Sequence, residues 1–342
     1  MRAIVYRVTG GPDVLRKAEW PVPEPGPGEV RVHLAVAGVN PTDWKMRRGS
    51  GPGQPPPFPE VVPGQDGAGT VDALGPDTDV PGLVPGARVW VWEAGWQRAA
   101  GTAQDYVVLP AAQVVPLPDN ASLELGASLG IPALTAHRAL TLGADGPERL
   151  GPGTLDGRTV LVAGGAGAVG NAAVQLARWS GARVLATVSS AAKGELARAA
   201  GADAVVDYRA RGAATVVRDL APEGVDLVVE LAPATNAALD AAVLAPGATV
   251  SVYADNGGAE ALLPVRAFMT VNASWRFVFV YTVPAPAKSA AVADVARAVA
   301  DGALRVGTEA GLSLHRFPLE QAAAAHAAVE AGTVGKVLLE LR

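Results

Sequence analysis

The chain has 342 residues, a net charge of −5 and no cysteine. Its length exceeds what one hydrophobic core usually covers, which predicts two domains. The absence of Cys excludes disulfides, Cys-ligated zinc and thiol nucleophiles, and the scattered charges argue against nucleic acid or an anionic membrane as a partner. Because the sequence shows neither a signal-peptide core nor an apolar run of about 18 residues, we expect a cytoplasmic, soluble protein without a membrane partner.

The first 125 residues or so have the pattern of an all-β fold. Short apolar runs are separated by stretches rich in Pro and Gly, and the prolines fall in the connections, where they cost a sheet no hydrogen bond. The predicted strands are Arg2–Tyr6, Glu29–Val39, Gly67–Leu74, Arg88–Trp92 and Tyr106–Leu109.

From Leu123 the pattern changes to helices and then to alternating strands and helices. A helix is predicted over Leu123 to Ala144, with a break near Pro132. Apolar strands that alternate with helices predict a parallel sheet covered on both faces. The predicted strands are Thr159–Ala163, Val184–Thr187, Ala204–Asp207, Asp226–Leu231, Thr249–Tyr253 and Phe277–Val283, with helices between the first five, including Asn171–Ser180 and Ala191–Ala200.

The last segment predicts a return to the first domain. After a helix over Ala287–Asp301, a strand is expected at Leu312–His315, a helix at Pro318–Ala331 and a strand at Lys336–Leu341. The expected domains are therefore residues 1–124 with 306–342, rich in β-structure, and residues 125–305, a doubly wound α/β domain.

The strongest motif is a glycine-rich turn between a strand and a helix. Gly165-Ala166-Gly167-Ala168-Val169-Gly170 satisfies G-x-G-x-x-G directly after the strand Thr159–Ala163. Gly165 is expected to make the tight turn, Gly167 to let the backbone approach a pyrophosphate, and Gly170 to let helix and strand pack closely. A plain glycine-rich turn is the alternative, but the flanking elements favour a dinucleotide site.

The residues after the second strand of this domain favour NADPH over NADH. NAD-binding folds place an Asp or Glu about twenty residues after the motif to bind the ribose 2′-hydroxyl. Here Ser189 and Ser190 end the strand and Lys193 follows. Hydroxyls and an ammonium can donate to a 2′-phosphate, which a carboxylate would repel. Lys193 alone is equally compatible with a solvated helix residue, so the missing acid decides the prediction.

Five segments, in this order, resemble the zinc-independent, quinone oxidoreductase-like (zeta-crystallin-like) branch of the medium-chain dehydrogenase/reductase superfamily. The resemblance implies a GroES-like catalytic domain joined to a Rossmann domain, with the substrate in a cleft between them. The five segments are Gly38 to Lys45 (GVNPTDWK), Pro63 to Val71 (PGQDGAGTV), Leu134-Thr135-Ala136, Ala163 to Gly170 (AGGAGAVG) and Gly335-Lys336-Val337.

The departures from the zinc alcohol dehydrogenases of the same superfamily imply that no metal is used. Those enzymes carry a metal-binding Cys where this chain has Asn40, and a G-H-E motif where it has Gly64-Gln65-Asp66. Amides are poor zinc ligands compared with thiolate and imidazole. The four His residues are dispersed along the chain, so no metal site is expected.

The resemblance also implies roles for individual residues. Lys193 and Tyr208 stand where related reductases surround the 2′-phosphate, although Tyr208 also fits a half-buried strand end. Thr135 resembles a residue near the nicotinamide. Asn40 is expected beside the nicotinamide ribose or the substrate, with a turn-forming Asn before Pro41 as the alternative.

Two lysines complete the expected site. Lys45 stands where many quinone reductases have a Tyr, so it is a candidate catalytic residue to which the role of a tyrosine does not carry over. Lys336, in the Gly335-Lys336 pair, is expected to close near the cofactor from the C-terminal segment.

The sequence therefore predicts an NADPH-dependent reductase that delivers hydride to a quinone or an α,β-unsaturated carbonyl. A pathway-specific enoyl or alkenal reductase is the alternative within the enzymes, and an NADPH-binding redox sensor or structural protein is the alternative outside them. A homodimer is expected, formed through the apolar strand Phe277–Val283, whose edge nothing covers.

Overall fold

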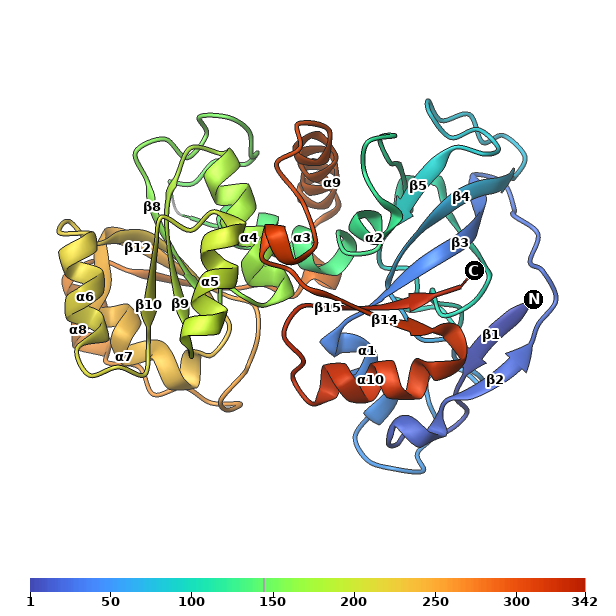
Figure 1. Ribbon diagram of the computed structural model, residues 1–342, viewed down its shortest axis with the longest axis horizontal. Coiled ribbons are helices and arrows are strands. Elements are labelled where there is room, and N and C mark those ends of the chain that lie inside the picture. Colours follow the sequence, from blue (N-terminus) through green and yellow to red (C-terminus); the bar gives the residue numbers. More distant parts are fainter. Residues whose placement is uncertain (144, 342) are drawn as a thin grey trace. The chain divides into compact units, whose positions relative to one another are not determined.

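The computed structural model describes residues 1–143 and 145–341. The chain forms two compact units, one made of Met1–Ile131 with Leu314–Arg342 and the other of Pro132–Ser313 (Figure 1). We call them unit 1 and unit 2. The divisions fall at 131/132 and 313/314, a few residues later than the 124/125 and 305/306 expected from the sequence.

Unit 1 is built on a seven-stranded sheet and a separate hairpin. In the sheet the order is β14-β15-β3-β4-β5-β7, with β6 also paired to β3, while β1 and β2 form the hairpin. Its strands are β1 (Arg2–Val5), β2 (Arg16–Glu19), β3 (Glu29–Val39), β4 (Asp66–Leu74), β5 (Arg88–Val91), β6 (Tyr106–Pro110), β7 (Val114–Pro116), β14 (Leu314–Pro318) and β15 (Lys336–Glu340).

The register at the centre of this sheet places residues from distant parts of the chain at one end. Strand β3 is antiparallel to both β15 and β4, with Val39 opposite Val337 and Gly38 opposite Asp66. Asn40 follows β3 directly, and Lys336 is the first residue of β15. The end of β3 therefore meets the beginnings of its two neighbours.

Short helices complete unit 1. They are α1 (Pro41–Arg48), α2 (Leu123–Gly126) and α10 (Ala322–Glu330), with 3₁₀ turns η1 (Pro12–Val14), η2 (Ala111–Gln113) and η5 (Leu319–Gln321). Helix α1 begins at Pro41, where a missing N–H costs nothing. Asn40 precedes it in an extended conformation, and the Asp43 carboxylate accepts the Asn40 backbone N–H at 2.7 Å.

Unit 2 is a doubly wound sheet of six parallel strands in the order β10-β9-β8-β11-β12-β13. This is the 3-2-1-4-5-6 order of dinucleotide-binding folds. Its strands are β8 (Thr159–Ala163), β9 (Arg183–Val188), β10 (Ala204–Asp207), β11 (Val225–Glu230), β12 (Leu244–Val252) and β13 (Ser274–Phe277). The inner strands are buried almost throughout because helices cover both faces.

The helices of unit 2 follow the predicted alternation. They are α3 (Gly130–Leu140, which begins at the division), α4 (Ala168–Trp179), α5 (Ala191–Ala200), α6 (Ala213–Leu220), α7 (Pro233–Val243), α8 (Val265–Thr270) and α9 (Ala285–Ala300), with 3₁₀ turns η3 (Val280–Thr282) and η4 (Thr308–Ala310). The fold class, a GroES-like β-rich domain and a Rossmann domain, is confirmed.

Two predicted elements of this part of the chain differ from the structure. The helix predicted from Leu123 is interrupted before α3, and Pro132 lies in the first turn of α3, where a helix tolerates proline. The predicted end of that helix, Ala144, lies outside the described residues. The sixth strand is Ser274–Phe277, and the apolar residues after it form a 3₁₀ turn instead of a strand.

The C-terminal return also differs in detail, since its first strand begins at Leu314 and its helix is confined to Ala322–Glu330 after a 3₁₀ turn. The sequence prediction missed α1, β2, β7 and α8 altogether. Among the described residues, no helix has the length and apolar character needed to cross a membrane.

Candidate active site

The glycine-rich turn of unit 2 has the geometry of a dinucleotide cradle, with one change in the role of its glycines. Gly164, at φ +68°, makes the tight turn that the sequence predicts at Gly165. A Cβ on Gly165 would lie 2.8 Å from the Cβ of Ala186, so this glycine serves close packing. A Cβ on Gly170 would lie 2.3 Å from the carbonyl oxygen of Gly164, so the helix packs closely on the turn, as expected.

Helix α4 starts at Ala168, directly after this turn. Gly167 is its N-cap residue, and no side chain caps the helix. Because the first N–H groups of a helix lack partners within the helix, Ala168 and Val169 lie where an anion can accept them. A Cβ on Gly167 would have only one neighbouring atom, the Gly164 oxygen at 3.5 Å, so the chain does not fill the space above the turn.

The predicted 2′-phosphate residues gather at the carboxyl end of β9 and β10. Val188 pairs with Asp207 in the parallel register, so the following residues, Ser189 and Tyr208, lie at the same edge. The Lys193 ammonium donates to the Ser189 hydroxyl at 3.0 Å, and the Ser190 hydroxyl caps α5 by accepting the Lys193 backbone N–H. All four predicted residues are half-buried.

Sequence reasoning missed a further cation at this edge. Arg209 follows Tyr208 directly and forms an ion pair with Asp207, with 3.6 Å between its Nε and the carboxylate oxygen. The Arg209 side chain is 59% exposed and therefore open to a second anionic partner. A basic residue immediately after the third strand was the available signal.

A buried polar cluster of unit 1 lies where β3, β4 and β15 meet. The Lys336 ammonium donates to Asn40 Oδ1 at 2.7 Å and approaches Asp66 Oδ2 at 3.3 Å. Asn40 Nδ2 donates to the same Asp66 oxygen at 2.7 Å, and the Ile131 backbone N–H donates to the other oxygen at 2.8 Å. Asn40, Asp66 and Lys336 are 2%, 0% and 1% exposed.

Burial controls the charges of the acids in this cluster. It raises the pKa of Asp43 to about 7, and the nearby Asp66 carboxylate adds to the shift. The pKa of Asp66 is also raised by burial, against the lowering effect of the Lys336 ammonium and the Asn40 hydrogen bond. Buried acids with raised pKa values are typical of functional sites.

The remaining predicted residues lie in different surroundings. Thr135 is buried on α3, and Lys45 is exposed on α1. The Lys336 ammonium is buried in unit 1, where it donates to Asn40 and lies close to Asp66. Asp66, which the sequence reasoning treated only as a lost zinc motif, proves to be the centre of the cluster.

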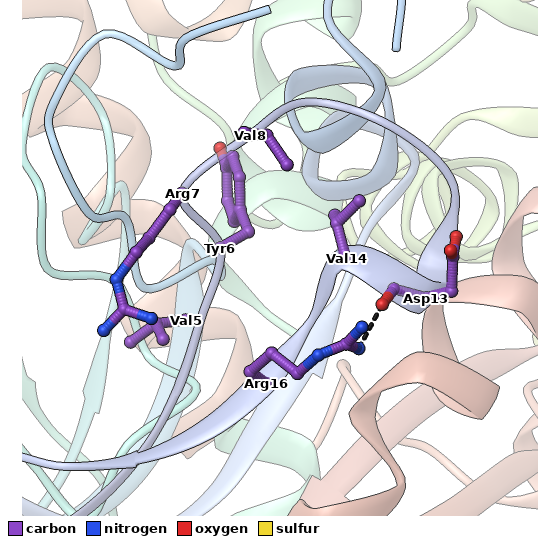
Figure 2. Close-up of a pocket in the computed structure, with 7 residues that line it drawn as sticks. All are labelled: Val5, Tyr6, Arg7, Val8, Asp13, Val14 and Arg16. Atoms are coloured by element: carbon purple, nitrogen blue, oxygen red, sulfur yellow. Dashed lines mark hydrogen bonds between the residues drawn. The ribbon is translucent and has the colours of Figure 1, made fainter. Parts of the chain in front are cut away.

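A surface hollow of about 230 Å³ elsewhere in unit 1 contains none of these residues. It is lined by Val5, Tyr6, Arg7, Val8, Asp13, Val14 and Arg16 (Figure 2). Arg7 pairs with Glu60 and Arg16 bonds to the Asp13 backbone oxygen, so both guanidinium groups have partners within the protein. The hollow is not the candidate active site.

Two family models match the chain. Residues 26–119 match the alcohol dehydrogenase GroES-like domain, and residues 168–298 match the zinc-binding dehydrogenase domain. The chain is 30% identical to the quinone oxidoreductase of Rattus norvegicus over 100% of its own length and 98% of that protein's. It is 38% identical to a trans-enoyl reductase of Aspergillus niger over 63% of its own length and 59% of that protein's.

Solved structures show the same relationship. A mycobacterial protein crystallised with NADPH superposes with a TM-score of 0.82 at 31% identity, and an NAD-dependent alcohol dehydrogenase with a TM-score of 0.86 at 33% identity. Each likeness covers 100% of both chains. The two cofactor names differ, so the choice between NADPH and NADH depends on this chain's own residues.

The residues present do not fit the zinc that the name of the second family model implies. Across residues 1–143 and 145–341, no group of three or more His, Asp or Glu side chains could hold a metal ion. Asn40 and Gln65 offer only amides, and the Asp66 carboxylate is already paired with the Lys336 ammonium, which would repel a cation. A dinucleotide, by contrast, fits the uncapped helix and the Ser and Lys donors of unit 2.

Proposed function

We propose that this chain, which belongs to the quinone oxidoreductase-like branch of the medium-chain dehydrogenase/reductase superfamily, transfers hydride from NADPH to a quinone or to an α,β-unsaturated carbonyl without a metal. The family makes it an NAD(P)-dependent oxidoreductase. The proposal of metal-free hydride transfer rests on the cluster around Asn40. This cluster offers a neutral amide and the paired Lys336 and Asp66 where zinc-using members of the superfamily require metal ligands.

The cofactor would be held by unit 2. The backbone from Gly165 to Val169 would receive the pyrophosphate at the start of α4, and Ser189, Ser190, Lys193 and Tyr208 would surround the 2′-phosphate. NADPH is favoured because the edge offers hydroxyls and an ammonium, and charge-assisted hydrogen bonds to phosphate are strong. The bound cofactor supplies a hydride, and the protein supplies binding, orientation and exclusion of water.

Asn40 and Gln65, which are poor zinc ligands, limit the acceptors. When hydride arrives at a saturated carbonyl, the full charge develops on one oxygen, which zinc enzymes meet with a Lewis acid. In an enone, the hydride and its electron pair go to the β-carbon, the π electrons move to the oxygen, and the α-carbon takes a proton from water. Charge spread in this way needs only neutral donors, and the Asn40 amide and the Thr135 hydroxyl are the candidates.

A panel of quinones and enones, assayed by NADPH oxidation, tests the proposal. We expect turnover with at least one conjugated acceptor, and poor activity on saturated ketones and simple alcohols. Tight NADPH binding with no consumption across the panel would instead support the alternative of a redox sensor. Strong preference for a single enoyl substrate would support a pathway-specific enoyl reductase; the Aspergillus niger relative is named a trans-enoyl reductase.

A further inference from the structure

Asn40 is the only side chain of the cluster whose amide is held from both ends by charged groups. Its oxygen accepts from the Lys336 ammonium and its nitrogen donates to the Asp66 carboxylate, each at 2.7 Å. All three groups are almost completely buried, so solvent screens these interactions little.

The two charges fix which way the amide points. If the amide were turned over, its NH₂ group would face an ammonium and its oxygen a carboxylate, and both contacts would be repulsive. The observed orientation leaves one Nδ2–H over, because only one of the two hydrogens faces Asp66. Within residues 1–143 and 145–341, that second N–H has no hydrogen-bond partner.

The surrounding backbone is shaped to admit this arrangement. A Cβ on Gly38 would lie 2.9 Å from both Cε and Nζ of Lys336 and 2.2 Å from the Ala127 oxygen. A Cβ on Gly130 would lie 2.2 Å from Asp66 Oδ1. The lysine and the carboxylate therefore each occupy room that a glycine leaves open, and the Ile131 N–H fixes the far oxygen of Asp66.

We propose that Lys336 and Asp66 are positioning residues that hold the Asn40 amide in one orientation, so that its remaining N–H donates to the acceptor's carbonyl oxygen as charge develops there. The inference rests on the proposed function, since it names the donor of that same reaction. It gives Lys336 a role other than the cofactor contact expected from the sequence.

The rival interpretation is a pair that only stabilises the fold. The two interpretations differ in what replacing the whole pair should do. A buried ion pair exchanged for uncharged groups of similar volume often leaves stability unchanged, whereas removal of one partner leaves an unpaired buried charge. Only the positioning role predicts that a folded protein without the pair remains a poor catalyst.

The test is a cycle of variants built on the double replacement Lys336→Met with Asp66→Asn. We expect the double variant to fold, to bind NADPH within about twofold of wild type by fluorescence titration, and to lose about ten- to a hundredfold in kcat, since a misplaced catalytic group typically costs that much. Asn40→Ala should lose a similar factor. In the Asn40→Ala protein, the double replacement should lower kcat by less than about twofold more, because the pair acts through Asn40.

A matched control replaces another ion pair of unit 1. Arg2→Met with Asp105→Asn removes a partly buried pair, 2.9 Å apart, that does not contact the cluster, and should leave kcat unchanged. The inference would be overturned, and the proposed function left standing, by either of two results. One is a wild-type kcat in the Lys336/Asp66 double variant. The other is a double replacement that lowers kcat as much in the Asn40→Ala protein as in the wild type. A large loss of NADPH affinity in the double variant would show that Lys336 contributes to cofactor binding, and would also overturn the inference. Absence of turnover in the wild type would overturn the proposed function and this inference with it.

Discussion

Unit 1 and unit 2 each bury a carboxylate among several donors, but with opposite effects on its ionisation. Asp66 in unit 1 and Asp294 in unit 2 are 0% and 2% exposed. Burial raises the pKa of Asp66 in spite of Lys336 and Asn40. Burial also acts to raise the pKa of Asp294, but hydrogen bonds from His137, Arg149 and the Leu150 N–H outweigh it and lower that pKa to about 2.

The donors explain the difference. Asp294 accepts from His137 Nε2 at 2.8 Å, from Arg149 Nε at 2.9 Å and from the Leu150 N–H at 2.7 Å. The Arg149 side chain is 58% exposed, so its charge stays hydrated while it contributes. The partner of Asp66, by contrast, is itself buried and loses its hydration.

The two carboxylates therefore differ in role. Asp294 stabilises the fold as an ion, whereas burial makes the ionised form of Asp66 unfavourable. Asp294 on α9 ties α3 to the segment around Arg149 and Leu150 within unit 2. Asp66 and Asp43 keep raised pKa values in unit 1, which is expected where charge is reserved for a reaction. Substitution of Asp294 in unit 2 should therefore lower stability, whereas substitution within the cluster of unit 1 should lower catalytic activity.

The largest effect should come from Asp294→Ala. Removal of the carboxylate leaves the buried His137 ring and the Leu150 N–H without their acceptor, and should lower the free energy of unfolding by about 3–5 kcal/mol. Because the folded pKa is depressed, the wild-type contribution is present above the unfolded value and is lost as pH falls through about 2.

Urea unfolding at pH 7 measures this loss. The control is Arg149→Met, which removes an exposed partner and should cost only about 1 kcal/mol or less. An Asp294→Ala protein as stable as wild type, or one that is stable but catalytically dead, would remove the distinction between the two carboxylates.

The next effect concerns pH and Asp43. Its folded pKa, about 7, lies above the value of 3.8 for an unhindered Asp, so the folded state holds the proton more tightly. This contribution to stability is present below the unfolded pKa and is lost as pH rises to and through about 7, on the order of 4 kcal/mol in total. Asp43→Asn should therefore flatten the decline in unfolding free energy between pH 5 and pH 8. Parallel pH profiles of the two proteins would show that Asp43 is ionised normally.

How far the sequence could predict this architecture depends on the range of the interactions. The cofactor turn was predictable because strand, glycines and helix are contiguous, although only coordinates show that Gly164, and not Gly165, has the positive φ. The Lys336–Asn40 bond joins residues 296 positions apart and depends on the antiparallel register of β15 with β3, which no local pattern encodes.

The edge strand shows a different limit. An unbroken apolar run such as Phe277–Val283 has the composition of a strand, but the chain turns after Phe277. Within this run, Val280 and Tyr281 are buried in unit 2, whereas Phe277 and Phe279 are exposed. Composition alone cannot distinguish the buried residues from the exposed ones.

A smaller effect is expected from Lys193→Ala. Charge-assisted hydrogen bonds contribute roughly 1.5–3 kcal/mol each, so NADPH affinity should fall by about ten- to a hundredfold, while NADH affinity hardly changes. Arg209→Ala should produce a weaker loss because Asp207 already pairs with the guanidinium. Fluorescence titration with both cofactors measures the losses, and equal losses for NADPH and NADH would mean that Lys193 supports the fold.

The smallest effect concerns assembly through the sheet of unit 2. Strand β13 is the edge of the sheet, and Phe277 on it is 75% exposed, so we propose that two copies pair there as a homodimer. Phe277→Lys should weaken the dimer by about tenfold or more in light scattering at graded concentration. Val280→Lys is the poorer choice, since Val280 is buried within its own unit. A wild-type monomer at micromolar concentration contradicts the proposal.

The central claim is direct, metal-independent hydride transfer to a conjugated acceptor, and isotope transfer tests it. Chelator-treated protein is supplied with NADPH stereospecifically deuterated at the transferable position and with an enone that it turns over. The account predicts that deuterium appears at the β-carbon of the saturated product, at a rate unchanged by the chelator. Loss of activity with the chelator, restored by zinc, or product without deuterium at the β-carbon, would contradict it.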